Sequence, residues 1–161
     1  RDICQRHGQE YYASAVGEVN VVRTMRQVKA VIGGEGNGGV IVPDLHYGRD
    51  ALVGIALFLS HLALRGCSAK SLRDTYPTYE MAKEKVSFDP NQRPEALLQR
   101  LSDAFADAQQ NWEDGLKIDL ENAWLHVRKS NTEPILRIYT EATSLKEAQA
   151  LAEKARQILL L

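Results

Sequence analysis

The second half of the chain alternates between strand-type and helix-type patterning in an order that few folds accommodate. Apolar and polar residues alternate over residues 116–120 and 123–128, and a polar loop then leads to a third strand candidate at 134–139. Apolar residues at helical spacing lie on either side of these strands. They are Leu97, Leu101, Phe105 and Ala108 before the strands and Leu145, Ala148, Ala152, Ala155 and Ile158 after them. This pattern predicts a sheet of adjacent strands covered by two helices.

Local signals mark where these elements begin. Pro94 is well placed at the first turn of a helix, and Ser144 with Glu147 forms a capping box before the last helix. Residues 85–88 add a weak edge strand. The order strand, helix, three strands, helix predicts a small α+β domain with an antiparallel sheet.

The first half mixes short apolar runs with helical segments. Strands are predicted at residues 10–16, 29–32 and 40–42, and helices at 19–27, 49–65 and 68–75. The helix at 49–65 has apolar residues on several sides, so we expect it to be largely buried. Strands mixed with helices predict an α/β region with a mixed sheet.

The stretch from residue 78 to 93 is the predicted domain boundary, since prolines cluster around it. It divides the chain into domains at 1–77 and 78–161. Residues 1–8 resemble the end of a helix closed by Gly8, with no initiator Met. We therefore expect a fragment that begins inside a domain.

Composition excludes several classes of partner. The 161 residues include 20 Lys and Arg against 21 Asp and Glu, so the chain lacks the excess of positive charge expected of nucleic-acid or membrane-surface binding. No apolar run approaches the roughly 18–20 residues that span a bilayer. The 2 cysteines form no disulfide framework and suit a reduced, cytoplasmic compartment. The histidines show no metal-ligand spacing, so no metal site is expected in this chain.

Residues 33–39 hold five glycines interrupted by Glu35 and Asn37. No Lys followed by Ser or Thr completes a phosphate-binding P-loop, and the dinucleotide spacing leads into a predicted strand instead of a helix. An acceptor carboxylate and an amide on a glycine loop suit sugar hydroxyls. The alternative is a hairpin connection with a solvated glutamate.

Residues 128–134 form the second loop of interest. Arg128, Ser130, Asn131 and Thr132 bring a guanidinium, two hydroxyls and an amide together, and Arg137 follows on the next strand. Guanidinium groups with hydroxyl and backbone donors are the usual ligands of phosphate. The alternative is a polar turn flanked by surface arginines.

Together these two loops resemble motifs of the α-D-phosphohexomutase superfamily, which includes phosphoglucomutase, phosphomannomutase and phosphoglucosamine mutase. The sugar-binding loop of that family, Gly-Glu-x-Ser/Asn-Gly, corresponds to residues 34–38. Its phosphate-binding loop, Arg-x-Ser-Gly/Asn-Thr-Glu-Pro, corresponds to residues 128–134. Val16-Gly17 and Arg49-Asp50 also match, and the resemblance covers essentially the whole chain.

The resemblance implies a four-domain parent enzyme that interconverts hexose 1-phosphates and 6-phosphates. Residues 1–77 then correspond to a partial third domain of the α/β class, and the rest to a linker and a fourth domain related in fold to TATA-binding protein. A phosphoserine in the first domain and an Mg²⁺ loop in the second would supply the chemistry. Neither is in this chain, which we therefore expect to be inactive alone, with the missing N-terminal domains as its partners.

The resemblance also implies roles for individual residues. Glu35 and Asn37 would contact sugar hydroxyls, and Arg128, Ser130, Asn131 and Thr132 would hold the non-transferring phosphate, with Arg137 in support. The family often has His at the end of the sugar loop where this chain has Gly39. The loop reads hydroxyls that glucose, mannose and glucosamine share, so all three hexose phosphates remain possible substrates.

Two other functions remain as alternatives. The chain could be a non-catalytic phosphosugar-binding module, in which case no phosphoserine or metal loop would precede it. It could also bind nucleic acid through the domain related to TATA-binding protein, but the lack of a basic stripe argues against this. Fold analogy alone does not establish a function.

Overall fold

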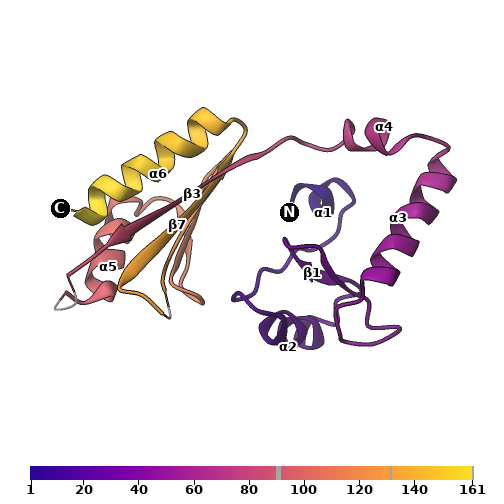
Figure 1. Cartoon of the computed structure of the whole chain (residues 1–161), viewed down its shortest axis with the longest axis horizontal. Coiled ribbons are helices and arrows are strands. Elements are labelled where there is room, and N and C mark those ends of the chain that lie inside the picture. The colour runs from indigo at the N-terminus through magenta and orange to yellow at the C-terminus, as the bar shows by residue number, and fades with distance from the viewer. Residues whose placement is uncertain (90–91, 131, 161) are drawn as a thin grey trace. The chain divides into compact units, whose positions relative to one another are not determined.

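The computed structural model describes residues 1–89, 92–130 and 132–160, and it divides into two compact units, Arg1–Pro77 and Thr78–Leu161. Figure 1 shows the course of the chain. We describe the two units separately, as unit 1 and unit 2.

Unit 2 is a five-stranded antiparallel sheet with both of its helices on one face (Figure 1). The strands are β3 (Glu80–Ser87), β4 (Gln109–Asn111), β5 (Leu116–Asp119), β6 (Ala123–Lys129) and β7 (Ile135–Ala142), in the spatial order β3-β7-β6-β5-β4. The helices are α5 (Pro94–Ala104) and α6 (Leu145–Leu160). The predicted α+β domain with its edge strand, its two helices and its antiparallel sheet is confirmed.

The core lies between the sheet and the helices. Every second residue of each long strand faces it, as the alternation predicted, and the expected faces of α5 and α6 complete it. The fully buried members include Leu101, Leu116, Ile118, Leu125, Val127, Leu136, Ile138, Ala148, Ala152 and Ala155. The predicted capping box at α6 is also present, because Ser144 Oγ accepts the Glu147 N–H at 3.3 Å.

The sequence analysis missed β4. This strand is a short polar segment held by its middle residue, because the Gln110 amide nitrogen donates to the carbonyls of Ser102 and Phe105 at 2.9 and 3.0 Å. The Ser102 hydroxyl donates to the Gln110 amide oxygen in return, at 2.6 Å. These bonds to the end of α5 attach β4 to the domain without an apolar pattern.

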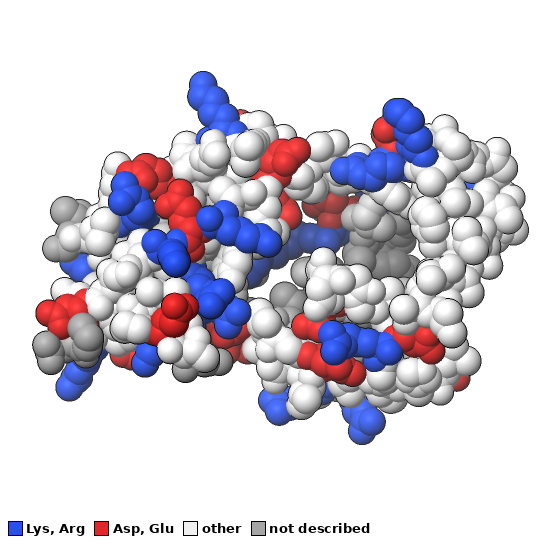
Figure 2. All heavy atoms as spheres, viewed as in Figure 1, with Lys and Arg blue, Asp and Glu red and all other residues white. Residues whose placement is uncertain are grey.

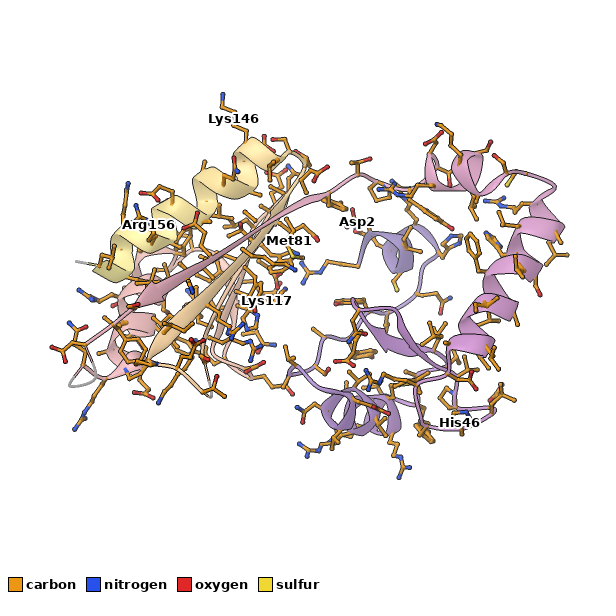
Figure 3. All side chains as sticks on the ribbon, viewed as in Figure 1. Asp2, His46, Met81, Lys117, Lys146 and Arg156 are labelled. Atoms are coloured by element: carbon orange, nitrogen blue, oxygen red, sulfur yellow. The ribbon has the colours of Figure 1, made fainter. Side chains whose placement is uncertain are left out.

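The other face of this sheet carries polar and aromatic side chains. Figure 3 shows Met81 and Lys117 on the opposite side of the sheet from α6. Three cross-strand rows lie on this open face: Lys85, Arg137 and Arg128; then Lys83, Tyr139, His126 and Lys117; then Met81, Glu141, Trp124 and Asp119. Figure 2 shows positive and negative side chains interspersed over the visible surface of unit 2, without a continuous basic stripe.

Unit 1 consists of α1 (Asp2–Arg6), α2 (Glu18–Val28), the hairpin of β1 (Gly33–Glu35) and β2 (Gly39–Ile41), α3 (Ala51–Arg65) and α4 (Ala69–Arg73). The strands β1 and β2 pair antiparallel, and this pair is the sheet of unit 1 within the described residues. The three predicted helices are confirmed.

Two predicted strands of unit 1 are wrong. Residues 10–16 form no strand. Residues 29–32 are also not a strand, because Lys29 ends α2 in the left-handed conformation with φ 55° and Ala30 N–H bonds back to Met25 O at 2.9 Å. The chain therefore turns within the apolar segment at residues 29–32, and Val31 is 83% exposed. The strand begins at the glycines instead.

The expected burial of α3 is also wrong. Asp50 and Gly66 cap this helix at its ends, but none of its residues is buried. Leu52 and Leu64 are 78% and 86% exposed. Apolar residues stand on several sides of α3, and unit 1 packs only a small part of that surface, around Gly54 against Val40 of β2. No helix in the described part of the chain has the length and apolarity needed to cross a membrane.

Candidate functional site

The glycine-rich segment is a tight hairpin that presents Glu35 and Asn37 at its tip. Gly38 N–H bonds to Glu35 O at 3.1 Å, and Gly38 has a φ of 92°, which favours glycine. The Asn37 side-chain oxygen accepts the Gly39 N–H at 3.1 Å. Asn37 therefore stabilises the turn with its side-chain oxygen, and its two amide hydrogens remain available to another acceptor.

Three of the glycines stand close to neighbouring atoms, and at Gly34 the neighbour is backbone. A Cβ on Gly33 would lie 2.3 Å from Met25 Sδ, and a Cβ on Gly34 would lie 2.2 Å from Gly39 O. A Cβ on Gly39 would lie 2.6 Å from Arg49 Cδ. The absence of a larger residue at the end of this loop therefore leaves room for the Arg49 side chain.

Arg49 fixes the position of the Glu35 carboxylate, a role that the sequence analysis did not assign. Its Nε donates to Glu18 Oε2 at 2.8 Å and its Nη1 to Glu35 Oε2 at 3.4 Å. The Glu35 side chain is only 17% exposed. One guanidinium therefore joins the start of α2 to the hairpin. The signal in the sequence was its position directly before the N-cap of α3.

The segment next to Arg49 is held by a second set of bonds. Asp50 Oδ1 accepts the Val53 N–H at 3.0 Å as the N-cap of α3, and His46 Nε2 donates to Asp50 Oδ2 at 3.1 Å. Gly48 N–H donates to His46 Nδ1 at 3.0 Å, so the ring proton is on Nε2. The bond from Val53, followed by that from His46, holds the pKa of Asp50 below its usual 3.8.

The second candidate loop connects β6 to β7 in unit 2. Ser130 N–H bonds to Ile135 O at 2.9 Å and Ile135 N–H to Glu133 O at 2.8 Å, which closes the hairpin. Ser130 is 4% exposed, and its Oγ lies 3.4 Å from both the N–H and the hydroxyl of Thr132. The two hydroxyls of the predicted site therefore lie together. Asn131 is outside the described residues.

The two arginines stand directly opposite each other on neighbouring strands. Arg128 of β6 and Arg137 of β7 are register partners on the open face of the sheet. Arg137 reaches Glu133 at 3.8 Å, whereas Arg128 Nε is buried and has no hydrogen-bond partner among the described residues. A buried donor without a partner is costly, and like charges opposite each other destabilise a sheet. An anion beside this loop would offset the repulsion between the two arginines.

Gly115, directly before β5, packs against the backbone of Arg128. A Cβ on this residue would lie 2.4 Å from Val127 O and 2.8 and 2.9 Å from Arg128 Cβ and Cα. The φ of Gly115 is 74°, which also favours glycine. The backbone of β6 can approach this closely only because residue 115 has no side chain. The sequence analysis gave Gly115 no role.

The described residues contain no cluster of three or more His, Cys, Asp or Glu side chains that could hold a metal ion. The resemblance places the Mg²⁺ loop in another domain of the parent enzyme, and we assign no residue of the described chain to that ion. What the two loops offer is hydrogen bonding and positive charge.

Comparisons with known proteins agree with the observed fold. A family model described as "Phosphoglucomutase/phosphomannomutase, alpha/beta/alpha domain III" matches residues 1–79. A second, described as "Phosphoglucomutase/phosphomannomutase, C-terminal domain", matches residues 91–158.

Curated relatives are similar over nearly the whole chain. A phosphoglucomutase/phosphomannomutase of Thermococcus kodakarensis is 32% identical over 98% of this chain and 35% of its own length. A phosphoglucosamine/phosphogalactosamine mutase of Sulfurisphaera tokodaii is 33% identical over 89% of this chain and 32% of its own. The chain therefore spans about a third of the length of the relatives it matches.

Solved structures share the fold. A phosphoglucomutase/phosphomannomutase family protein from Burkholderia thailandensis has a TM-score of 0.75 and 25% identity over 96% of this chain and 33% of its own. A phosphomannomutase-like protein from Thermus thermophilus has a TM-score of 0.67 and 24% identity, covering 99% of this chain and 33% of its own.

Proposed function

The chain belongs to the phosphoglucomutase/phosphomannomutase family, and from this membership we propose that it forms the substrate-positioning part of a phosphohexomutase. The full enzyme would interconvert the 1-phosphate and 6-phosphate of a hexose or hexosamine. In this proposal the hairpin at residues 33–41 corresponds to part of the third domain and the β6–β7 loop to the fourth.

The observation that carries the proposal is the unsatisfied positive charge beside the β6–β7 loop. Arg128 and Arg137 stand opposite each other on the adjacent strands β6 and β7, and Arg128 Nε is buried without a partner in the described chain. A phosphate would accept from the guanidinium of Arg128 and from the hydroxyls of Ser130 and Thr132, and it would neutralise the arginine pair. Asn131 belongs to the same proposed site by its place in the motif.

The hairpin of unit 1 would hold the sugar. Glu35, held by Arg49, offers carboxylate oxygens as acceptors. Asn37 offers its amide hydrogens as donors, because its oxygen is bonded to Gly39 N–H. An acceptor beside a donor matches two neighbouring hydroxyls, each of which donates one bond and accepts another.

This chain would bind and orient the substrate, and the transfer step would need groups from elsewhere in the full enzyme. Mg²⁺, when bound there, would stabilise the charge of the transferring phosphoryl group. The residues of this chain would hold the other phosphate and the sugar ring in both orientations of a bisphosphorylated intermediate. We expect no mutase activity from the 161-residue chain alone.

An NMR titration of this chain with glucose, mannose and glucosamine 6-phosphates tests the proposal, with inorganic phosphate as the reference ligand. The amides of Ser130 and Thr132 should shift with all four ligands, and the amide of Asn37 only with the sugar phosphates. Arg128→Ala should weaken binding of every ligand by about 1.5–3 kcal/mol, the contribution of hydrogen bonds to charged groups. Unchanged affinity in this variant would contradict the proposed phosphate site.

Asn37→Asp separates the sugar role from the structural role of the same residue. The aspartate keeps an oxygen that accepts the Gly39 N–H, so the hairpin should be retained. It loses the two donor hydrogens, so the sugar phosphates should bind more weakly, while the affinity for inorganic phosphate should not change. Normal sugar-phosphate affinity in Asn37→Asp would remove this residue from the proposed site.

A further inference from the structure

A third cation stands in line with the two arginines of the proposed phosphate site. Lys85 of β3 is the register partner of Arg137, and Arg137 is the partner of Arg128. The three side chains share the open face of the sheet, because their strand neighbours Val86, Leu136 and Val127 are buried on the helical side. They therefore form a row of three positive charges across β3, β7 and β6, which we call the cation row.

The ion pair between Arg137 and Glu133 neutralises little of the charge of the cation row. Glu133 lies 3.8 Å from Arg137 in an ion pair whose side chains are 42% and 55% exposed, and such pairs contribute little. Lys85 and Arg128 form no ion pair within the described part of the chain. Like charges directly opposite each other destabilise a sheet, so the row is unfavourable unless an anion lies against it.

The acidic residues of the same face are occupied elsewhere. Glu141 Oε1 accepts the Trp124 Nε1–H at 2.9 Å, and Asp119 pairs with Lys117. Glu141 and Asp119 stand in the row that contains Met81, two rows from the cation row. The charge in the cation row is therefore local to the end of the sheet that carries the β6–β7 loop.

The end of β3 adjoins that loop. Phe88 N–H donates to Pro134 O at 3.4 Å, so the chain directly after β3 is bonded to the residue that closes the loop. Lys85 stands three positions before Phe88, and Arg137 three positions after Pro134. The ammonium group of lysine has three donors on a flexible stem, which suits a phosphate that must be held in two sugar orientations.

We propose that Lys85 is a third phosphate-binding cation, placed by the pairing of β3 with β7 at the same anion as Arg128 and Arg137. The inference rests on the proposed function and adds a residue to its phosphate site. It assigns the edge strand β3 a role in binding, and it predicts that the site prefers dianionic to monoanionic phosphate.

The test compares Lys85→Gln with Lys83→Gln in the whole chain. Lys83 lies on the same strand and the same face but pairs with the neutral Tyr139 in the next row. Binding of inorganic phosphate, followed by NMR or calorimetry, should weaken roughly threefold to tenfold in Lys85→Gln and less than twofold in Lys83→Gln. Equal losses in the two variants would reflect the general field of the face and would overturn the assignment.

A second measurement needs no ligand. In phosphate-free buffer at low salt, Lys85→Gln should raise the melting temperature of unit 2, because it removes repulsion within the cation row. The increase should disappear near 1 M NaCl, where the Debye length is about 3 Å, and Lys83→Gln should show no such increase. A lower melting temperature in Lys85→Gln at low salt would contradict the proposed repulsion.

The outcomes separate the two proposals. Normal phosphate binding in Lys85→Gln together with weakened binding in Arg128→Ala would overturn the role of Lys85 and leave the phosphate site in place. If the unmodified chain binds no phosphate, both proposals fail. Weakened binding in Lys85→Gln and Arg128→Ala, but not in Lys83→Gln, supports both.

Discussion

Replacement of Gly115 by alanine should destabilise unit 2 by about 3 kcal/mol or more, for two separable reasons. An L-residue in the left-handed region costs about 1–2 kcal/mol, and the loss of glycine freedom in the unfolded chain offsets about 0.4–1 kcal/mol of that. Steric conflict contributes more, because the new Cβ would lie 2.4 Å from Val127 O and 2.8 Å from Arg128 Cβ. An ordinary carbon–oxygen contact is about 3.3–3.6 Å, so β5 must move about 1 Å from β6.

This movement weakens the pairing that begins at Leu116 and Val127. Each ladder hydrogen bond lost costs about 1 kcal/mol, and both of these residues are fully buried in the core. The two tryptophans, Trp112 and Trp124, both lie in unit 2, so urea denaturation followed by tryptophan fluorescence reports on this unit. The midpoint should fall in Gly115→Ala.

Gly115→Asn is the control that distinguishes the backbone strain of the left-handed conformation from the steric conflict of the new Cβ. Asparagine tolerates the left-handed region far better than alanine does but also carries a Cβ. If the contact with β6 dominates, the two variants should lie within about 1 kcal/mol of each other. If Gly115→Asn unfolds like the unmodified chain, the steric argument is refuted. Both variants should also weaken phosphate binding, since the clash is with the Cα and Cβ of Arg128.

Two further predictions concern the stability of each unit. The folded pKa of Asp50 lies below its usual 3.8, so the stabilisation of α3 that depends on it is present above that pH and is lost as pH falls through the folded pKa. The Val53 amide should therefore lose protection from hydrogen exchange below about pH 4 in the unmodified chain. Protection that does not change with pH would contradict the capping role of Asp50. The Asp50→Asn variant should lack this pH dependence. Leu101→Ala should destabilise unit 2 by about 2–5 kcal/mol in urea denaturation, because Leu101 is fully buried between α5 and the sheet, and a loss below 1 kcal/mol would contradict that placement.

The fold of unit 2 could be predicted because its local patterns and its packing agree. The alternation over β5, β6 and β7 places every second side chain in the core, and the apolar faces of α5 and α6 cover them. The exception was β4, where Gln110 attaches a polar segment to α5 through side-chain bonds that no periodicity announces.

Unit 1 was less predictable because its apolar segments and its strands do not coincide in the sequence. Residues 29–32 have the composition of a buried strand, yet the left-handed Lys29 turns the chain there and leaves Val31 exposed. The helix α3 was predicted to be buried from its apolar residues alone. Burial depends on what packs against a helix, and local sequence does not contain that information.

The candidate sites show the same division. The motif at residues 128–134 pointed to Arg128 and the two hydroxyls, and Arg137 was added because it follows on the next strand, where it is the register partner of Arg128. The register of β3 against β7 could not be read from spacing, since α5 and three strands separate them in the chain. Lys85 was therefore missed, and so was Arg49, whose partner Glu18 is 31 residues away.

The proposed recognition groups favour a class of substrate over a single sugar. The arginines and Lys85 would contact a phosphate, which all hexose phosphates share. The hairpin would add one acceptor, Glu35, and one donor, Asn37, which match two neighbouring hydroxyls. Relatives of this chain include proteins described as a phosphoglucomutase/phosphomannomutase and as a phosphoglucosamine/phosphogalactosamine mutase. Selection among these sugars would then depend on contacts from outside the two loops, and the titration should separate phosphosugar from phosphate more sharply than one hexose from another.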